Sequence, residues 1–518
     1  MAIVPITIHQ ILGGWSPSEN FGSPGQFIAS LGVDPELPKN DSDKTISGLI
    51  RPTAMAKFSA TTVTGAPMWI IPNPVDADKN FVYATDGKIH LITSALAMGT
   101  DVATLATAGG NGAAYYKNFG YFARNTDIAR YRADGAVAID TSFWVTTLAK
   151  TALANKAYPS IRGVAIPNHA MHVHPSNSRL YVCDVDSDDK GCLHMINTKK
   201  GTVEGDTNDT TTPSAYKAIS FGYKEYPVAL DSLGTQLVIG CINSVNASVM
   251  NSRAFSIIIW DTTSSTYQSV AHHYADPLVT AVKNVNGVIY VFSGTANGGC
   301  RISYLSSSHS LKQIAYIPNA APPFAGATDS CFERVIFGGF TTIPEDTGCL
   351  FALGSKESRM GLGVHNIYKA NVDAGSNPIV TCAKYLELTS HKGIQPVIGW
   401  KTGTAQGLDK TSTTYGTWYL WSERFRIGQE FTIKKIVIPL AQAVAANMTI
   451  TPKIYTDQGL VSTALRAINN TNFSGLKQAV FNDPVKGNND FYLELKGTGT
   501  VLLTVSVPIR ILVDVHGQ

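Results

Sequence analysis

Paired apolar runs recur along the chain from about Pro52 to about Tyr368, and a polar turn interrupts each pair. In FVYATDGKIHLI (residues 81–92), the dipeptide Asp86–Gly87 separates two such runs, which is a strong hairpin signal. Comparable pairs return at intervals of roughly 35–55 residues, without any matching helical periodicity. This recurrence predicts an all-β chain in which residues 51–371 form a β-propeller of about seven blades.

The strands of these pairs are apolar at odd and even positions alike. In LYVCDV (residues 180–185), Leu180 and Val182 would face one side of the strand, and Tyr181 and Cys183 the other. A strand with two apolar faces is expected where a sheet is packed between neighbouring sheets. The repeat has neither the Trp-Asp signature of WD40 proteins nor the double glycine of kelch proteins.

Three other segments complete the chain. Residues 1–50 are rich in Gly, Pro, Ser and Asp, and they predict an extended N-terminal arm with the apolar anchors Trp15, Phe21 and Phe27. These anchors would pack either on their own chain or on a neighbouring subunit. Residues 372–399 are expected to be a linker. From 400 to 518 the apolar positions alternate, which predicts a jelly-roll-like β-sandwich.

Composition narrows the classes of partner. Charged residues make up 15% of the 518 residues, against about 25% in an average soluble domain. The net charge is +3 and the longest basic run is TKKG (residues 198–201), so we expect no sequence-specific nucleic-acid binding.

No apolar run reaches the ~20 residues that span a bilayer, so we expect no membrane insertion. The first residues lack the features of a secretory signal, and seven irregularly spaced cysteines predict free thiols in a reducing cytoplasm.

The stretch from His169 to Met195 gathers the residue types that bind metals. Because side chains alternate along a strand, His172 and His174 would share one face and His169 would lie on the other. Two metal sites are therefore conceivable here, a transition-metal site at His172 and His174 and a calcium site in the loop that follows. The calcium candidates are Asp184, Asp186 and Asp188.

The calcium pattern is incomplete. Asp189 stands where a calcium loop needs glycine, and Met195 stands where it needs a bidentate glutamate. A hairpin turn explains the same aspartates and glycine, because these residues supply turn backbone angles. The favoured prediction is therefore a hairpin without a metal or any other cofactor.

Catalytic motifs are scarce. The chain has no G-x-S-x-G, H-E-x-x-H, Walker A or dinucleotide fingerprint, so we name no catalytic residue. Paired carboxylates brought together from distant blades would not show in the sequence. Trp418 and Trp421 differ by three positions and would face opposite sides of a strand, which favours packing over a sugar-stacking platform.

The chain resembles virion structural proteins of tailed bacteriophages. The stretches that carry the resemblance are GGWSPSENFGSPGQFIASLGVDPELP (residues 13–38), GLIRPTAMAKFS (48–59), ITPKIYTDQG (450–459) and VPIRILVDVHG (507–517). It implies a non-enzymatic tail or neck component, similar to propeller-bearing nozzle and hub proteins, that is assembled in the host cytoplasm. The partners implied are copies of itself in a ring and other tail or neck proteins, with a host-surface glycan as a further candidate. The alternative is a propeller that binds or cleaves carbohydrate.

Overall fold

The computed structural model describes most of the chain. The described residues are 2–8, 14–15, 26–36, 48–58, 63–74, 76, 78–93, 95, 97–105, 108–132, 138–197, 214–243, 255–271, 276, 278–295, 298–331, 334–354, 363–370, 378–388, 393–412 and 415–516. Within these ranges the protein is all-β, and the only α-helix is the four-residue α1 (Asn470–Phe473). No helix in these ranges is long and apolar enough to cross a membrane.

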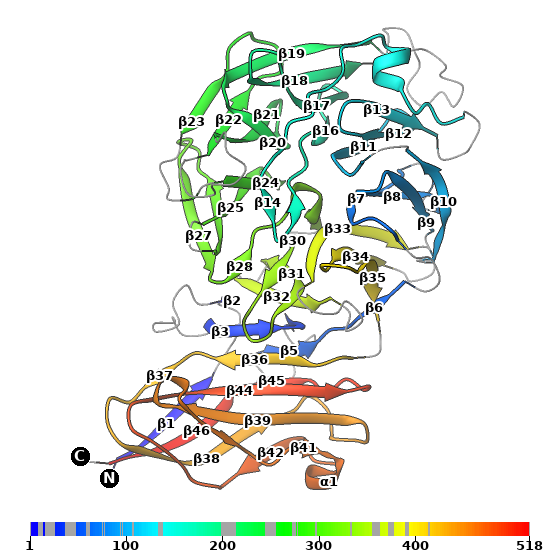
Figure 1. Cartoon of the computed structure of the whole chain (residues 1–518). Coiled ribbons are helices and arrows are strands. Elements are labelled where there is room, and N and C mark those ends of the chain that lie inside the picture. Colours follow the sequence, from blue (N-terminus) through cyan, green and yellow to red (C-terminus); the bar gives the residue numbers. More distant parts are fainter. Residues whose placement is uncertain are drawn as a thin grey trace.

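Seven sheets of the described residues stand around a common centre, which is the arrangement of a β-propeller (Figure 1). The first four sheets are β7 (Pro67–Ile71), β8 (Asn80–Ala84), β9 (Lys88–Ile92) and β10 (Met98–Thr104); β11 (Gly112–Tyr116), β12 (Phe119–Ala123) and β13 (Ile128–Tyr131); β16 (Met171–His174), β17 (Arg179–Val185), β18 (Lys190–Asn197) and β19 (Ser214–Tyr223); and β20 (Tyr226–Leu233), β21 (Gln236–Ile242), β22 (Ser256–Trp260) and β23 (Gln268–Ala271). The fifth and sixth are β24 (Leu278–Val285), β25 (Val288–Gly294), β26 (Cys300–Leu305) and β27 (Leu311–Ile317); and β28 (Ala320–Ala321), β29 (Thr328–Cys331), β30 (Arg334–Thr341), β31 (Thr347–Leu353) and β32 (Val364–Lys369). A short hairpin of β14 (Ser160–Ile161) and β15 (Val164–Ala165) lies at the centre of the ring in Figure 1.

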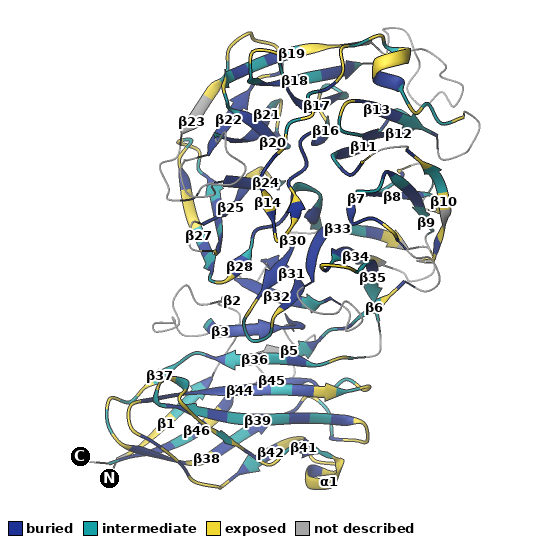
Figure 2. Cartoon of the chain, viewed as in Figure 1, coloured by how far each residue is buried: buried dark blue, intermediate teal, exposed yellow. Residues whose placement is uncertain are grey.

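The predicted hairpins are antiparallel strand pairs. β8 and β9 pair from Asn80↔Ile92 to Tyr83↔Ile89, and Gly87 in the turn between them has a φ of +82°, a conformation that favours glycine. Figure 2 shows the strands nearest the centre largely buried, whereas an outer strand such as β27 is partly exposed. Every residue of β30 and β31 is buried, as expected for a sheet packed between two others.

The seventh sheet joins two distant parts of the chain. It consists of β33 (Ile379–Leu388), β34 (Gly393–Lys401), β35 (Gln406–Thr411) and β6 (Met55–Lys57). β6 pairs with β35 from Asp409↔Lys57 to Thr411↔Met55, so the chain closes the ring with a strand that precedes the first sheet. The structure therefore differs from the predicted linker at 372–399, because β33 and most of β34 belong to this sheet.

Two further sheets share one core beneath the propeller, and we call them the two-sheet domain. One sheet holds β1 (Ala2–Ile8), β46 (Ile509–Val515), β38 (Phe431–Pro439), β42 (Gln478–Phe481) and β43 (Val485–Gly487). The other holds β2 (Gly14–Trp15), β3 (Gln26–Leu31), β36 (Trp418–Ser422), β37 (Phe425–Arg426), β44 (Asp490–Gly499), β39 (Met448–Thr456), β40 (Val461–Ala464) and β41 (Ile468–Asn469). A small sheet of β4 (Val33–Glu36), β5 (Gly48–Pro52) and β45 (Val505–Val507) accompanies them. The core side chains of these sheets are continuous with Phe292 and Phe337 of the propeller.

The N-terminal segment is part of this domain and not an extended arm. β1 pairs with β46 in unbroken register from Ala2↔Val515 to Ile8↔Ile509, and β3 pairs with β36. Phe27 is fully buried, so this predicted anchor packs on its own chain. Phe21 lies outside the described residues. The prediction of an arm failed because the glycine- and proline-rich stretches hide short strands whose partners, β46 and β36, lie far along the sequence.

Candidate functional site

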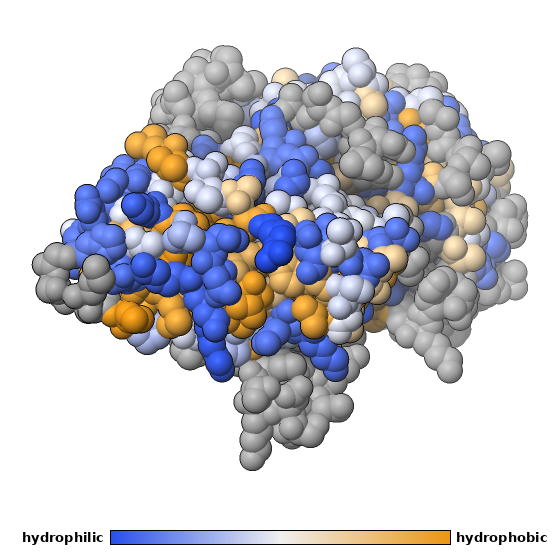
Figure 3. All heavy atoms as spheres, turned by 90° about the horizontal axis from the view of Figure 1, so that it is seen from below, coloured by the Kyte–Doolittle hydropathy of each residue, from blue (hydrophilic) through white to orange (hydrophobic). Residues whose placement is uncertain are grey.

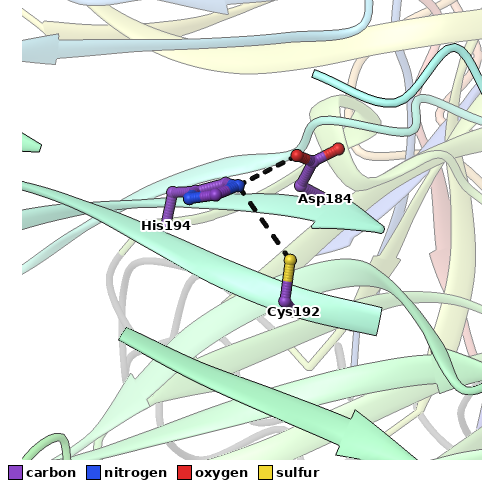
Figure 4. Close-up of side chains that lie close together, drawn as sticks. All are labelled: Asp184, Cys192 and His194. Atoms are coloured by element: carbon purple, nitrogen blue, oxygen red, sulfur yellow. Dashed lines mark hydrogen bonds and ion pairs between the residues drawn. The ribbon is translucent and has the colours of Figure 1, made fainter. Parts of the chain in front are cut away.

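The third sheet brings together three side chains of metal-binding type. Asp184 on β17 pairs in register with Cys192 on β18, and His194 follows two positions later on the same strand. Since side chains alternate along a strand, Cys192 and His194 lie on one face, next to Asp184 (Figure 4). The His194 Nε2 lies 2.9 Å from Asp184 Oδ2 and 4.0 Å from Cys192 Sγ. Among the described residues this is the only group of three or more His, Cys, Asp or Glu side chains close enough to share an ion.

The Asp184 carboxylate is held from several sides. Its Oδ1 accepts a hydrogen bond from the Ala154 amide at 2.9 Å, and His169 Nδ1 lies 3.7 Å away. Burial on its own would raise the pKa of Asp184, but the hydrogen bond from His194 and the charges of His169 and His194 outweigh burial and lower the pKa below 3.8. Asp184 is therefore ionised at neutral pH and oriented before any ligand binds.

Cys192 is not arranged as a nucleophile. Burial, and then the carboxylates of Asp184 and Asp186, raise the pKa of this thiol far above its ordinary range, so it is protonated at neutral pH. The one imidazole nitrogen that approaches the sulfur already contacts Asp184. A Cys–His–Asp relay instead needs one ring nitrogen for the cysteine and the other for the carboxylate.

The remaining candidates from the sequence are dispersed. Asp186 accepts hydrogen bonds from the amides of Asp188 and Lys190, which is the hydrogen bonding of a turn, and pairs with Lys217 at 3.3 Å. Asp188 is 72% exposed beside Lys190. His172 bonds Ser232, and His174 approaches the carbonyl of Gln236 at 3.3 Å, so the two side chains share one face of the strand, as predicted, and this face is toward the fourth sheet. His169 instead contacts the carbonyls of Cys183 and Asn125.

A cavity of about 370 Å³ lies at the centre of the propeller. The innermost strand of each sheet contributes to its wall. The polar and charged residues of this wall are His172, Asp231, Lys283, Thr328 and Lys384. The apolar residues include Trp69, Tyr115 and Met171. Sequence reasoning missed this group, because its members come from different sheets and no two stand at a motif spacing.

The charges around the cavity pair with one another. Lys384 Nζ lies 2.8 Å from Asp329 Oδ1, and Lys283 lies between Asp231 at 3.7 Å and Asp329 at 4.0 Å. Burial would raise the pKa of Asp329, but Lys384 and Lys283 outweigh burial and lower the pKa. The formal charges of the two lysines and the two aspartates therefore balance one another.

His172 at the edge of this network is held neutral. Its Nε2 lies 2.5 Å from the Ser232 hydroxyl and 3.9 Å from Asp231. Burial lowers the pKa of His172 from 6.5 to about 4, against the opposing attraction of Asp231. A neutral imidazole at this position adds no charge to the balanced set of lysines and aspartates.

The two tryptophans of β36 lie on opposite faces of the strand, as their spacing predicts. Trp418 is buried in the core, whereas Trp421 on the other face of the strand lies 5.6 Å from Tyr492 and 6.1 Å from Tyr455, ring centre to ring centre. Tyr455 and Tyr492 stack at 4.8 Å with an interplanar angle of 6°. The three rings come from neighbouring strands and contact one another, so they act as a cross-strand aromatic ladder that stabilises the sheet.

Comparisons with known proteins show propellers among similar structures. No protein-family model and no curated protein sequence matches the chain. The β-propeller domain of Cps50 (Swd1) from Myceliophteria thermophila is 10% identical, with 69% of this chain and 98% of that chain covered and a TM-score of 0.40. The WD40 propeller domain of Doa1 is 9% identical, with 70% and 97% covered and a TM-score of 0.41. An exo-β-1,3-galactanase from Phanerochaete chrysosporium with galactose is 11% identical, with 70% and 99% covered and a TM-score of 0.30. At these TM-scores the likenesses carry no inference about function.

Proposed function

We propose that the protein is a non-enzymatic structural subunit that assembles with copies of itself through its two-sheet domain. The supporting observation is that this domain exposes large apolar side chains on edge strands. Ile3 and Val4 on β1 are 68% and 40% exposed, and Val461 on β40 is 50% exposed. Among the described strands, β1 and β40 each stand at the end of their sheet's strand order.

An edge strand with apolar side chains favours association. Such a strand offers unpaired backbone N–H and C=O groups, and soluble monomers usually protect it with charge or with a covering segment. Leu460, next to β40, is 86% exposed, and Leu476 and Val501 add to the apolar surface of this domain. Figure 3, which views the molecule from the side of the two-sheet domain, shows apolar residues gathered on this face. Covering such a surface in an assembly would remove it from water.

The resemblance to tailed-phage virion proteins extends this proposal to a specific setting. The subunit would form a symmetric ring in the tail or neck, assembled in the host cytoplasm and contacting other tail or neck proteins. A ring results when unlike surfaces of identical subunits meet and the rotation closes. We further propose that the seven sheets are seven blades of the propeller, that the two-sheet domain is a jelly-roll-like sandwich, and that the virion is the final location. Contact with a host-surface glycan would be an accessory role.

The carbohydrate-cleaving alternative would place its chemistry in the central cavity. A glycosidase needs one carboxyl group that keeps its proton and donates it to the leaving oxygen. The lysines beside Asp329 lower the pKa of this carboxyl, which works against that role. Hydrolysis of a polysaccharide by the purified chain, abolished by Asp329→Asn, would overturn the structural proposal.

The oligomeric state tests the proposed assembly. Light scattering of the purified full chain is expected to give a closed oligomer, and Ile3→Lys with Val461→Lys is expected to shift it to the monomer, because lysine on an edge strand opposes pairing. The matched control is Val288→Lys, since Val288 is an exposed valine of the propeller and 36% accessible. A wild-type chain that stays monomeric at high concentration would contradict the proposal. Absence of the chain from purified virions would overturn the virion setting alone.

A further inference from the structure

We propose that Asp184, Cys192 and His194 form a binding site for a divalent transition-metal ion of the zinc type. The proposal rests on the juxtaposition of three different donor atoms on adjacent strands of the third sheet. One carboxylate oxygen, one sulfur and one imidazole nitrogen lie within 4.8 Å of one another. The ion would occupy the space that these three atoms face in Figure 4.

The donor set selects the metal. Zinc accepts thiolate at about 2.3 Å and imidazole or carboxylate at about 2.0–2.2 Å, in tetrahedral geometry. Donors around such an ion lie somewhat over 3 Å apart, so the Asp184 carboxylate and the Cys192 sulfur, which lie within 4.8 Å of each other, would have to move closer together on binding. Calcium and magnesium prefer oxygen ligands only, and Cys192 and His194 therefore exclude them. Three protein donors leave a fourth position for water or another ligand.

The surroundings orient the donors. The Ala154 amide donates a hydrogen bond to Asp184 Oδ1, and the other carboxylate oxygen, Oδ2, points toward His194. The indole of Trp144 packs edge-on against the imidazole of His194 at 5.1 Å between ring centres. Neighbours that fix a ligand in this way commonly strengthen metal sites. His194 is 18% exposed whereas Asp184 and Cys192 are buried, so an ion would enter past the imidazole.

Binding would exchange a proton for the ion. The Cys192 S–H bond breaks, its electron pair forms the sulfur–metal bond, and one proton leaves to solvent. A neutral His194 moves its single proton from Nε2 to Nδ1 and binds through Nε2, whereas a protonated His194 releases its Nε2 proton to solvent; Asp184 is already ionised. Binding is thus expected to strengthen as the pH rises. Asp186 and Lys217 flank the thiol with opposing effects on its ionisation, and Lys217 is itself paired with Asp186.

We expect the chain to fold without the ion, because strand pairing holds the site together. β17 and β18 pair along six positions, and β18 pairs with β19. The proposed site is also independent of the assembly surface on the two-sheet domain. A chain that binds no metal would therefore not contradict the assembly proposal, and a chain that stays monomeric would not contradict the metal site.

Cobalt substitution tests the site directly. We expect the full chain, freed of metal with a chelator and titrated with Co²⁺, to develop the thiolate-to-cobalt charge-transfer band with a stoichiometry of one ion per chain. Zn²⁺ should displace the cobalt and remove the band. A chain that develops no band would overturn the proposal.

Variants assign the band to these residues. Cys192→Ser and His194→Gln are each expected to abolish it, whereas Cys331→Ser, which alters a half-buried thiol elsewhere, should retain it. Circular dichroism and thermal unfolding of each apo variant verify that the fold survives. If Cys192→Ser does not fold, His194→Gln decides, since it keeps the thiol and removes the nitrogen donor. A band that persists in either folded variant would overturn the assignment.

Discussion

Asp34 and Arg334 form a buried ion pair that joins the N-terminal segment to the propeller. The Arg334 Nη1 lies 3.1 Å from Asp34 Oδ2, and the two side chains are 1% and 6% exposed. Asp34 lies on β4, in the small sheet beside the two-sheet domain, and Arg334 begins β30 of the sixth propeller sheet. The pair therefore connects elements that are 300 residues apart in the sequence.

Asp34→Asn is expected to destabilise the protein by roughly 3–5 kcal/mol, because it leaves the Arg334 guanidinium buried without a counter-charge. Urea unfolding followed by circular dichroism would measure the loss. The control is Asp76→Asn, which removes the charge from an ion pair with Lys79 whose side chains are 37% and 38% exposed. That control is expected to cost less than about 1 kcal/mol. If the two substitutions lower the free energy of unfolding equally, the buried ion pair does not hold the N-terminal segment and the propeller together.

Ile8→Ala should destabilise the protein, whereas Ile3→Ala should not. Both isoleucines lie on β1, but Ile8 is 5% exposed within the core of the two-sheet domain and Ile3 is 68% exposed. Truncation of a buried isoleucine costs about 2–5 kcal/mol, and truncation of an exposed one falls within about 0.5 kcal/mol. Thermal unfolding of the two variants would measure the difference. Similar melting temperatures would show that β1 is not integrated into the domain.

The hairpins were predictable because their signals are local. Asp86–Gly87 and its flanking apolar runs specify a turn and two strands within about a dozen residues. That His172 and His174 lie on the same face of their strand was predictable for the same reason, since side chains alternate between the two faces of a strand. Local pattern therefore accounts for the strands and for the recurrence of the sheets.

Pairing between distant strands was not predictable. Nothing in the first eight residues identifies β46 as their partner, and nothing in 379–401 separates a propeller strand from a linker before the strands find their neighbours. Asp231 and Lys283 in the cavity wall, and Asp329 beside Lys283, likewise meet only through the closed ring. Cys192 and His194 did carry a usable signal, since a Cys-x-His spacing on a strand places both side chains on one face.

Native thiol labelling should modify one cysteine quickly. Of the seven free cysteines, six are buried and Cys331 is half-buried. Burial raises the pKa of Cys183, Cys241 and Cys349 and so suppresses the reactive thiolate. A disulfide reagent is expected to react with one thiol per chain before urea is added and with all seven afterwards. Cys331→Ser should abolish the fast reaction, and two or more fast thiols would contradict the burial of the others.

The stability of the protein should fall between neutral pH and about pH 4, and His172 should account for part of the loss. In the folded protein, burial lowers the pKa of His172 from 6.5 to about 4. Well above pH 6.5 the imidazole is neutral in the folded and the unfolded protein, so it does not change the free energy of unfolding. Between pH 6.5 and about pH 4 the imidazole is protonated in the unfolded chain but not in the folded protein, so stability decreases as the pH falls. The full difference corresponds to roughly 3 kcal/mol.

His172→Gln is therefore expected to flatten the pH dependence of the urea midpoint between pH 7 and pH 4.5. The slope is the decisive readout, because loss of the Ser232 hydrogen bond would lower stability at every pH alike. Part of the slope will remain, since burial also lowers the pKa of His365 to about 4. His309→Gln, which alters a half-buried histidine in the turn between β26 and β27, serves as the control for removal of a histidine outside the central network. If His172→Gln and the wild type lose stability in parallel, then His172 is not a buried neutral group of the central network.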